Sequence, residues 1–410
     1  MIIIIALFIG MAVLDLVIEL LNLRSWSATL PVEFDGYYDM ERYGIAQKYL
    51  ADKTVSGLVK EITLIAFIVL LIVSGAFNLI DEVARGLFAG PVGRGLVFAG
   101  ILFVLFFLVS LPFDIYGTFV IEEKYSFNRT TARTFVLDTV KSLLISGLFG
   151  AIVFTAVILL FEKTGSFAWI YGWLAVSLFQ LLIMYVAPVL IMPLFNKFNP
   201  LEEGNLKTGI EQLAQKENFQ IKGIYTIDGS KRSSKANAAL TGFGKFKRIM
   251  LYDTLINKMN ESEIVAVLAH EIGHYKHKHI LKFIVLSLVL SAVGFYLFSR
   301  IAAQPMLFSA FGAQHVSIYA ALIYFSILLM PVQRIISVGT NWISRSFEYS
   351  SDQYGAKASN NPEALGSALK KISADSMANL HPHHVKVFFD YSHPPVLDRI
   401  RALNIIGSGD

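Results

Sequence analysis

The feature that most constrains this chain is a set of seven apolar stretches, each long enough to cross a lipid bilayer. A membrane-spanning helix needs about 20 mostly apolar residues. Of the 410 residues, 55% are hydrophobic and only 16% are charged, whereas a typical soluble domain is about 45–50% apolar and about 25% charged. These values exclude an ordinary soluble enzyme and a disordered chain. They predict a mainly α-helical protein of the lipid bilayer, with spans at 1–23, 62–80, 96–120, 142–161, 167–195, 280–301 and 316–337.

The first span begins at residue 1 without a basic leading region or a small-residue cleavage site, so we interpret it as a retained helix rather than a signal peptide. It contains Asp15 and Glu19, four residues apart. Ionisable groups inside a span usually face a bundle interior or a water-filled cavity. The alternative is that the span ends before Asp15, and the sequence leaves both possibilities open.

The distribution of basic residues predicts the orientation of the spans. The loops at 24–61 and 119–141 contain nine Lys and Arg residues, and the loops on the opposite side contain three. The positive-inside rule therefore places the first set in the cytoplasm, together with the long polar segment and the C-terminal tail. The net charge of +4 is small for this length and does not suggest nucleic acid as a partner. The predicted units are 1–195 with five spans, 196–279, 280–338 with two spans, and 339–410.

The two polar units have the content of one small α+β domain. Apolar periodicity predicts helices at 202–219, 260–278, 339–359 and 362–374, and a last helix from about Val396. Two short β-prone runs lie at 221–228 and 248–253, with a loop at 229–244 between them. The helix at 260–278 is long enough to continue into the sixth span, and an irregular stretch rich in His and Pro precedes the last helix.

The strongest chemical signal is the sequence His-Glu-Ile-Gly-His at 270–274. Residues four apart project from one face of a helix, so His270 and His274 can bind one Zn²⁺ ion. Glu271 lies beside such a metal without ligating it and can act as a general base toward water. The alternative is a solvated helix with two surface histidines, but the apolar run at 264–269 favours a buried helix.

A catalytic zinc needs a third protein ligand, and the chain contains no cysteine. Glu348 and Asp352 lie four residues apart on the helix after the seventh span. Glu348 could complete the metal site while Asp352 orients a ligand histidine. An acidic pair on an exposed helix face is the alternative. We assign His277 and His279 to a basic flank at the mouth of the sixth span.

Several ordered motifs resemble those of the type I CAAX prenyl endopeptidases, which are membrane zinc metallopeptidases. The matching segments are 111–116, 122–124, 127–128, 228–234 with 237–238 and Gly242, 347–352, and 392–395 with Arg399. They lie in the same order along almost the whole chain, between matching spans. The resemblance implies a seven-helix bundle around a large water-filled chamber, capped on its cytoplasmic side by a zincin-type (gluzincin) α+β peptidase domain.

The resemblance also implies roles for particular residues. It makes His270, His274 and Glu348 the ligands of one Zn²⁺ ion, Glu271 the general base, and Asp352 the partner of a ligand histidine. It places substrate along the strand and loop at Asn237 and Ala238. It makes His393 a hydrogen-bond donor to the oxyanion, and Arg399 a residue that positions this region or contacts Glu348.

The implied substrate is a peptide or protein, prenylated at a C-terminal CAAX motif, from which the last three residues are removed. The short loops and the end at Asp410, without a long tail or a retention signal, favour a prokaryotic member in the bacterial plasma membrane. A eukaryotic member would lie in the ER membrane. In both cases we expect the peptidase domain to face the cytoplasm.

Three other functions fit parts of the pattern. A shorter type of membrane zinc protease for stress response or quality control shares the zinc motif but has fewer spans. A site-2-type protease carries its zinc helix inside a span, whereas charged residues flank the motif here. A transporter or chamber protein with a structural zinc would use Asp15, Glu19 and Asp114, but structural zinc sites are closed, usually with cysteines.

Overall fold

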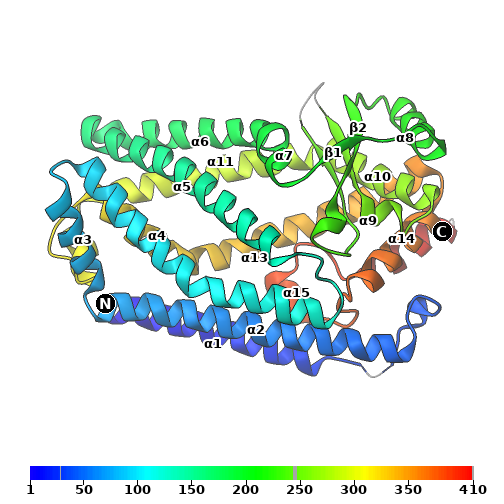
Figure 1. The fold of residues 1–410 in the computed structure, drawn as a ribbon, viewed down its shortest axis with the longest axis horizontal. Coiled ribbons are helices and arrows are strands. Elements are labelled where there is room, and N and C mark those ends of the chain that lie inside the picture. The colour runs from blue at the N-terminus through cyan, green and yellow to red at the C-terminus, as the bar shows by residue number, and fades with distance from the viewer. Residues whose placement is uncertain (28, 243–246, 409–410) are drawn as a thin grey trace.

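The computed structural model describes residues 1–27, 29–242 and 247–408. Long helices run side by side over most of its length, and a small sheet with shorter helices covers one end (Figure 1). Seven helical segments are long and apolar enough to cross a membrane, which confirms the predicted number. They are α1 (Ile2–Arg24), α2 (Met40–Val73), α4 (Pro91–Tyr116) with a π-helical extension (Gly117–Glu122), α5 (Ala132–Lys163), α6 (Ala168–Val186) with a π-helical extension (Ala187–Ile191) and α7 (Met192–Phe195), α11 (His279–Ile301) and α13 (Ile318–Ser359).

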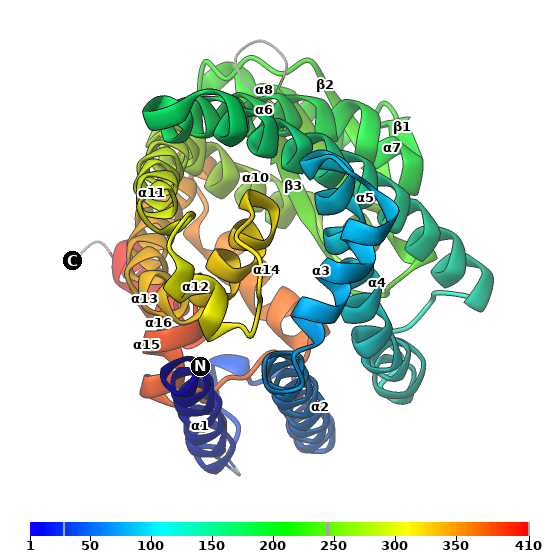
Figure 2. The same cartoon turned by 90° about the vertical axis from the view of Figure 1, so that its left-hand side faces the viewer.

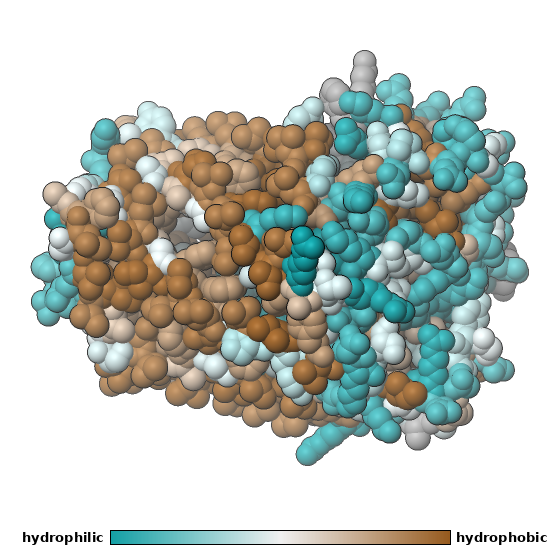
Figure 3. Space-filling view, in the orientation of Figure 1, coloured by the Kyte–Doolittle hydropathy of each residue, from teal (hydrophilic) through white to brown (hydrophobic). Residues whose placement is uncertain are grey.

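The seven long helices form a closed ring. Each contacts the next in the order α1, α2, α4, α5, α6, α11, α13, and α13 contacts α1 again (Figure 2). Cavities open between them, including one of about 650 Å³ lined by α4, α5 and α13. On the face shown in Figure 3, apolar residues form a broad band over the long helices, and polar residues cover the end that carries the sheet. The ring and its cavities agree with the expectation of helices around a chamber.

An aromatic core lies at the end of the ring that is distant from the sheet (Figure 1). Helices α3 (Ala76–Leu87) and α12 (Pro305–Ala310) contribute to it beside α4 and α13. Tyr324 stacks on Phe311 with ring centroids 4.4 Å apart, and Phe77 contacts both rings edge-on. Buried aromatic pairs of this kind stabilise a core beyond the area that they bury.

Two predicted span boundaries were wrong. The second span was expected at 62–80, but α2 ends at Val73, and Gly75, with φ of +70°, turns the chain into α3. Hydropathy does not detect this turn because α3 is itself largely apolar on the face that it buries. The seventh span and the following helix at 339–359 were expected as separate elements, but α13 is one continuous helix of 42 residues.

The helix of the zinc motif does not continue straight into the sixth span. Helix α10 (Glu261–Lys276) ends before Lys278, whose φ of +56° is left-handed, and α11 begins at His279. The polar run from Lys276 to Lys278 did not predict this break, because a continuous helix can also contain such a run. The break lets the metal-binding helix and the membrane helix follow different directions.

The capping domain contains a four-stranded mixed sheet in the order β1-β2-β4-β3. Strands β2 and β4 are parallel, while β1 pairs with β2 and β3 with β4 in the antiparallel sense. The structure contains the two predicted strands as β2 and β4, but the expected loop at 229–244 includes β3, and β1 was not predicted. The strands are β1 (Phe198–Pro200), β2 (Gly223–Ile227), β3 (Ala238–Thr241) and β4 (Arg248–Tyr252).

Five shorter helices complete this domain and pack around α10, the sheet and the end of α13. Leu213, Ile249, Leu251 and Leu268 belong to the core between the sheet, α8 and α10. The stretch expected to be irregular contains a short helix, α15, which lies against α1 and α13. The helices are α8 (Asn205–Lys216), α9 (Asp253–Ile256), α14 (Pro362–Asp375), α15 (His384–Asp390) and α16 (Val396–Ser408).

Helix α10 begins at a reciprocal capping box. The Asn260 side chain accepts a hydrogen bond from the backbone N–H of Glu263, and the Glu263 carboxylate accepts one from the backbone N–H of Asn260, both at 2.9 Å. Ser367 and Lys371 of α14 donate to the same carboxylate. Burial raises the pKa of Glu263, but these hydrogen bonds outweigh burial and hold it below its usual value. The cap therefore fixes the start of the helix and its contact with α14.

Replacing Asn260 by alanine should destabilise the protein by about 1 kcal/mol, the usual cost of losing a side-chain N-cap. Thermal unfolding in detergent should show this as a midpoint lowered by about 2–4 °C. Asn404→Ala, at an exposed position on α16, is the matched control and should leave the midpoint unchanged. An equal shift in both variants would contradict a capping role for Asn260.

Candidate metal centre and active site

The site forms where α10 and α13 approach each other through two glycines. A Cβ atom on Gly355 would lie 2.9 Å from the Cα of His270, and one on Gly273 would lie 3.2 Å from the Cα of Ser351. A contact below 3.0 Å requires backbone movement, so Gly355 permits the close approach and even alanine would disturb it. Gly355 lies seven residues, about two helical turns, beyond Glu348 and so on nearly the same face of α13.

This approach gathers the three predicted metal ligands. His270, His274 and Glu348 each offer one ligand atom, and these atoms lie within 4.8 Å of one another. The Nε2 atoms of the two histidines are 3.1 Å apart, and the Glu348 carboxylate oxygens lie 3.6 Å from His270 and 3.3 Å from His274. Two histidines of α10 and one glutamate of α13 therefore form one cluster.

The cluster suits a divalent metal ion. Oε2 of Glu348 is buried and has no well-aligned hydrogen-bond donor among the described residues. Two neutral imidazoles and one carboxylate are the donor set of catalytic zinc sites, which leave a further position open. A buried carboxylate oxygen without a hydrogen bond is costly, and a cation between these three side chains would satisfy it together with the guanidinium of Arg399, which lies 3.3 Å away.

A buried ion pair stands behind the cluster. Asp352 Oδ1 lies 2.9 Å from His270 Nδ1, and the guanidinium of Arg399 donates two hydrogen bonds to the Asp352 carboxylate, at 2.8 and 2.6 Å. Arg399 Nη1 is also 3.3 Å from Glu348. Burial lowers the pKa of Arg399, but the two carboxylates outweigh it and raise that pKa. A carboxylate on the second nitrogen of a ligand histidine fixes its tautomer and ring orientation.

His393 also reaches the cluster. Its Nε2 atom lies 3.3 Å from Oε1 of Glu348, although 62% of the side chain is exposed. It stands in the short segment between α15 and α16, three residues before the start of α16. The structure therefore brings His393 and Arg399, which only the resemblance had singled out, to Glu348 from a segment about 50 residues away in sequence.

Glu271 is half-buried on α10 beside the two histidines. Within the residues that the structure describes, its carboxylate makes no hydrogen bond or ion pair. It is thus free to accept a proton from a molecule held at the cluster. A general base needs this freedom together with hydrogen-bonding distance from the reacting water.

Asn237 and Ala238 lie at the start of β3, which contacts α10. Among the described strands, β3 pairs only with β4 and so forms one edge of the sheet. Asn237 is exposed, and its side chain accepts a hydrogen bond from the N–H of Ala238 at 2.8 Å. An edge strand can pair with an extended peptide through its free backbone groups.

The structure corrects the assignment of His279 to a solvent-exposed basic flank. His279 is 3% exposed, its Nδ1 atom lies 3.2 Å from Nδ1 of His274, and its ring stacks on Phe347 with centroids 3.9 Å apart. Residues five apart do not share a face of a continuous helix, so spacing gave no signal. The left-handed turn at Lys278 brings His279 back to the ligand. His277, in contrast, is exposed as expected.

Two other motifs of the resemblance contact each other beside the domain. Lys235 pairs with Glu122 at 2.7 Å, which links the loop before β3 to the end of the third span. Arg232 pairs with Asp138 at the same distance and donates to the backbone of Phe195. These contacts hold the start of the sheet against α5 and against the extension of α4.

Comparison with known families agrees with this arrangement. Residues 19–197 match the family model described as CAAX prenyl protease N-terminal, five membrane helices. Residues 200–406 match the model of peptidase family M48. Together the two models cover every ring helix except most of α1, the strands β2, β3 and β4, and every side chain of the cluster.

Individual relatives extend over most of the chain. A CAAX prenyl protease 1 homolog of Arabidopsis thaliana is 38% identical over 298 residues, covering 72% of this chain and 70% of the relative. One of Homo sapiens is 30% identical over 425 residues, covering 91% and 88%. The crystal structure of S. mikatae Ste24p superposes with a TM-score of 0.93, at 31% identity and 98% coverage of both chains.

Proposed function

The chain belongs to peptidase family M48 and is a multi-pass membrane metalloendopeptidase of the CAAX prenyl protease type, and from this we propose that it removes the C-terminal tripeptide of prenylated CAAX proteins with one bound Zn²⁺. The observation that supports the proposal most directly is the convergence of His270, His274 and Glu348 within 4.8 Å. The names of its relatives support the choice of substrate.

We assign the binding of zinc to the two histidines and Glu348, with Asp352 holding the ring of His270. When bound, Zn²⁺ polarises a carbonyl group and makes water acidic enough to ionise near neutral pH. Its ligand set leaves room for water or substrate. The buried ion pair between Asp352 and Arg399 fixes the cluster in advance, so little reorganisation accompanies the reaction.

The remaining side chains divide the chemistry. Glu271 accepts a proton from the attacking water and later transfers it to the leaving amine. The N–H of His393 donates a hydrogen bond to the oxygen of the scissile carbonyl as negative charge develops there. A substrate strand pairs with the edge of β3 at Asn237 and Ala238, which orients the scissile bond toward the cluster.

We further propose that residues 196–279 and 339–410 act as one peptidase unit on the cytoplasmic side, as the distribution of Lys and Arg indicates. The relatives described above are eukaryotic, so of the two membranes expected from the sequence we propose that of the ER. They give no support to a bacterial plasma membrane, which stays a prediction.

The test uses the full-length protein in detergent or proteoliposomes with a farnesylated CAAX peptide. We expect cleavage directly after the prenylated cysteine, loss of cleavage after treatment with a zinc chelator, and recovery on addition of Zn²⁺. The same peptide without the farnesyl group is the control and should be cleaved much more slowly. Equal cleavage of both peptides would favour a general quality-control protease, and cleavage that survives complete removal of metal would refute the metal-dependent mechanism.

A further inference from the structure

His393 contacts Glu348 although little packs around its own side chain. That side chain is 62% exposed and, besides Glu348, interacts with Ser392 at 2.9 Å. Its place therefore depends on the backbone on either side. On the downstream side, α16 is fixed by the two hydrogen bonds from Arg399 to Asp352. The upstream side is the end of α15, and the structure shows how this end is held.

Helix α13 holds the C-terminal end of α15 through its side chains. Arg345 donates from one nitrogen to the carbonyl oxygens of Val387 at 3.0 Å and Tyr391 at 2.6 Å. Asn341 donates to the carbonyl of Phe389 at 3.0 Å. The last carbonyls of a helix lack partners within the helix, so these contacts satisfy them and fix Tyr391, two residues before His393.

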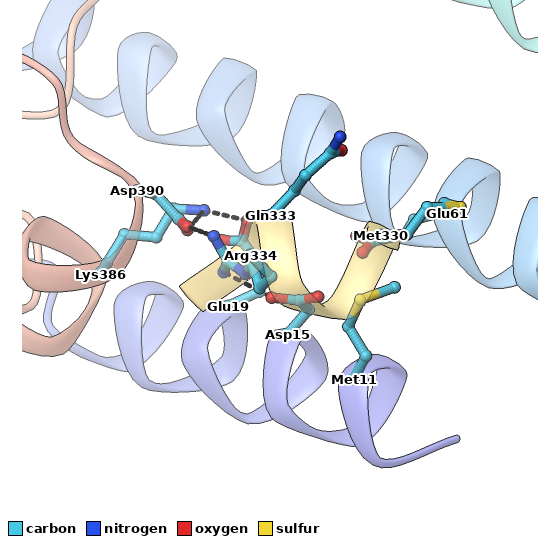
Figure 4. A pocket seen from close by; sticks show the side chains of 9 residues that line it. All are labelled: Met11, Asp15, Glu19, Glu61, Met330, Gln333, Arg334, Lys386 and Asp390. Carbon is cyan, nitrogen blue, oxygen red and sulfur yellow. Dashed lines mark hydrogen bonds and ion pairs between the residues drawn. The ribbon is translucent and has the colours of Figure 1, made fainter. Parts of the chain in front are cut away.

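A cluster of charged side chains holds the same end of α15 against α1. We define the α15 anchor cluster as Asp15, Glu19, Arg334, Lys386 and Asp390, which meet at a cavity of about 350 Å³ (Figure 4). Arg334 of α13 pairs with Asp15 of α1 at 2.5 Å and also with Asp390 of α15. Lys386 pairs with Glu19 of α1 and, at 2.7 Å, with Asp390.

The charges in this cluster are shared across three helices. Burial raises the pKa of Asp390, but hydrogen bonds from Arg334 and Lys386 outweigh it and hold the pKa below its usual value. Asp15 and Glu19 thus face a cavity, and α1 continues past both to Arg24. Charged groups on membrane-spanning helices are costly unless they are paired, and they usually mark a functional site.

The anchor cluster is too distant to take part in the reaction. Arg334 precedes Glu348 by 14 positions on one continuous helix, which corresponds to about 21 Å at 1.5 Å per residue. Residues 334, 341, 345 and 348 recur close to the helical repeat and share one face of α13. The face that contacts α15 is therefore continuous with the face that presents Glu348.

We propose that the α15 anchor cluster and Arg345 are positioning residues that set the location of His393 relative to the metal ligands. The inference rests on the proposed function, because it takes His393 as the donor to the developing oxyanion. Through this arrangement, the first membrane helix, which touches no catalytic residue, contributes to the rate of hydrolysis.

The variants Arg345→Gln and Asp15→Asn test the inference. Removing an oxyanion donor usually lowers kcat about 10²–10³-fold, and we expect that loss from His393→Ala. Displacing the donor without removing it should cause a smaller loss in kcat, about 10–50-fold for Arg345→Gln and about 3–10-fold for Asp15→Asn. KM and the bound zinc should stay unchanged. Arg345→Lys, which can still donate to one carbonyl, should recover part of the loss.

Matched controls separate position from general damage. Arg401→Gln removes an arginine whose ion pair with Glu33 lies at the surface, and Asp52→Asn removes an aspartate paired with Lys124. Both should retain wild-type kcat and KM. A role through His393 would be contradicted if Arg345→Gln lost its zinc, or if its KM rose by the same factor by which its kcat fell.

The decisive measurement is the double variant Arg345→Gln, His393→Ala. If Arg345 acts through His393, its substitution should lower kcat less than about twofold once His393 is absent, because residues that act as a unit are not additive. If Arg345→Gln costs the same factor in both backgrounds, the inference is overturned and the proposed function stands. If His393→Ala alone leaves kcat unchanged, the role given to His393 in the proposed function fails first.

Discussion

Replacement of Glu271 by glutamine should lower kcat for peptide hydrolysis by at least about 1,000-fold, within the range of about 10²–10⁴-fold that general acid–base groups contribute. Glutamine has almost the same shape but cannot accept a proton from water. The carboxylate has no hydrogen-bond partner among the described residues, so the substitution removes basicity without breaking a structural contact. Cleavage of the farnesylated peptide measures the rate, and elemental analysis measures the metal.

The metal content should stay at one zinc per chain, because Glu271 is not among the three clustered ligands. Glu261→Gln, in the exposed first turn of the same helix, is the matched control and should retain full activity. Substantial zinc-dependent cleavage by Glu271→Gln would disprove the assignment of this residue as the base. Loss of zinc from the variant would instead indicate that Glu271 contributes to metal binding.

Replacement of Asp352 by alanine should destabilise the folded protein by about 3–5 kcal/mol, the usual cost of removing one partner of a buried ion pair. Arg399 would then be left in a buried environment with only Glu348 at 3.3 Å. The ring of His270 would also lose its orienting carboxylate, so zinc affinity should fall about 10–100-fold. Thermal unfolding of the metal-free and zinc-loaded protein measures both effects.

A double substitution distinguishes the two effects of Asp352. Replacing Asp352 by leucine together with Arg399 by methionine removes both charges and keeps much of the buried volume, and such exchanges often restore stability. We expect the double variant to unfold close to the wild type in the absence of zinc but to bind zinc as weakly as Asp352→Ala. If zinc affinity recovers together with stability, the orienting role of Asp352 is wrong.

The membrane part of the fold was predictable from the sequence because a bilayer requires long apolar helices and leaves few alternatives. Where those helices end was less predictable. Gly75 stops α2 inside a run that remains apolar. In α13, the change from apolar to polar residues ends the predicted span, but the helix itself continues into the peptidase domain. The short strands β1 and β3 carry too few residues to show alternation, and only pairing with their neighbours forms them.

The site could be predicted as far as local spacing reaches. His270 with His274, and Glu348 with Asp352, are each four residues apart, and helix geometry alone places each pair on one face. That the two pairs meet depends on the close packing allowed by Gly273 and Gly355, which spacing does not reveal. His279 reaches His274 only through the turn at Lys278, and His393 arrives from a different part of the chain.

The separation of α10 from α11 has a consequence for how the two halves of the molecule communicate. The histidine ligands belong to a helix that ends at Lys276, whereas Glu348 belongs to a helix that begins among the membrane spans. A metal ion held by the two histidines and Glu348, as proposed, would therefore connect the peptidase domain to the membrane helices. Thermodynamic linkage is reciprocal. If binding of the ion stabilises the contact between α10 and α13, then strain that weakens this contact must lower the affinity for the ion. A bilayer thickness or lipid composition that strains α13 would then lower zinc occupancy at the proposed site.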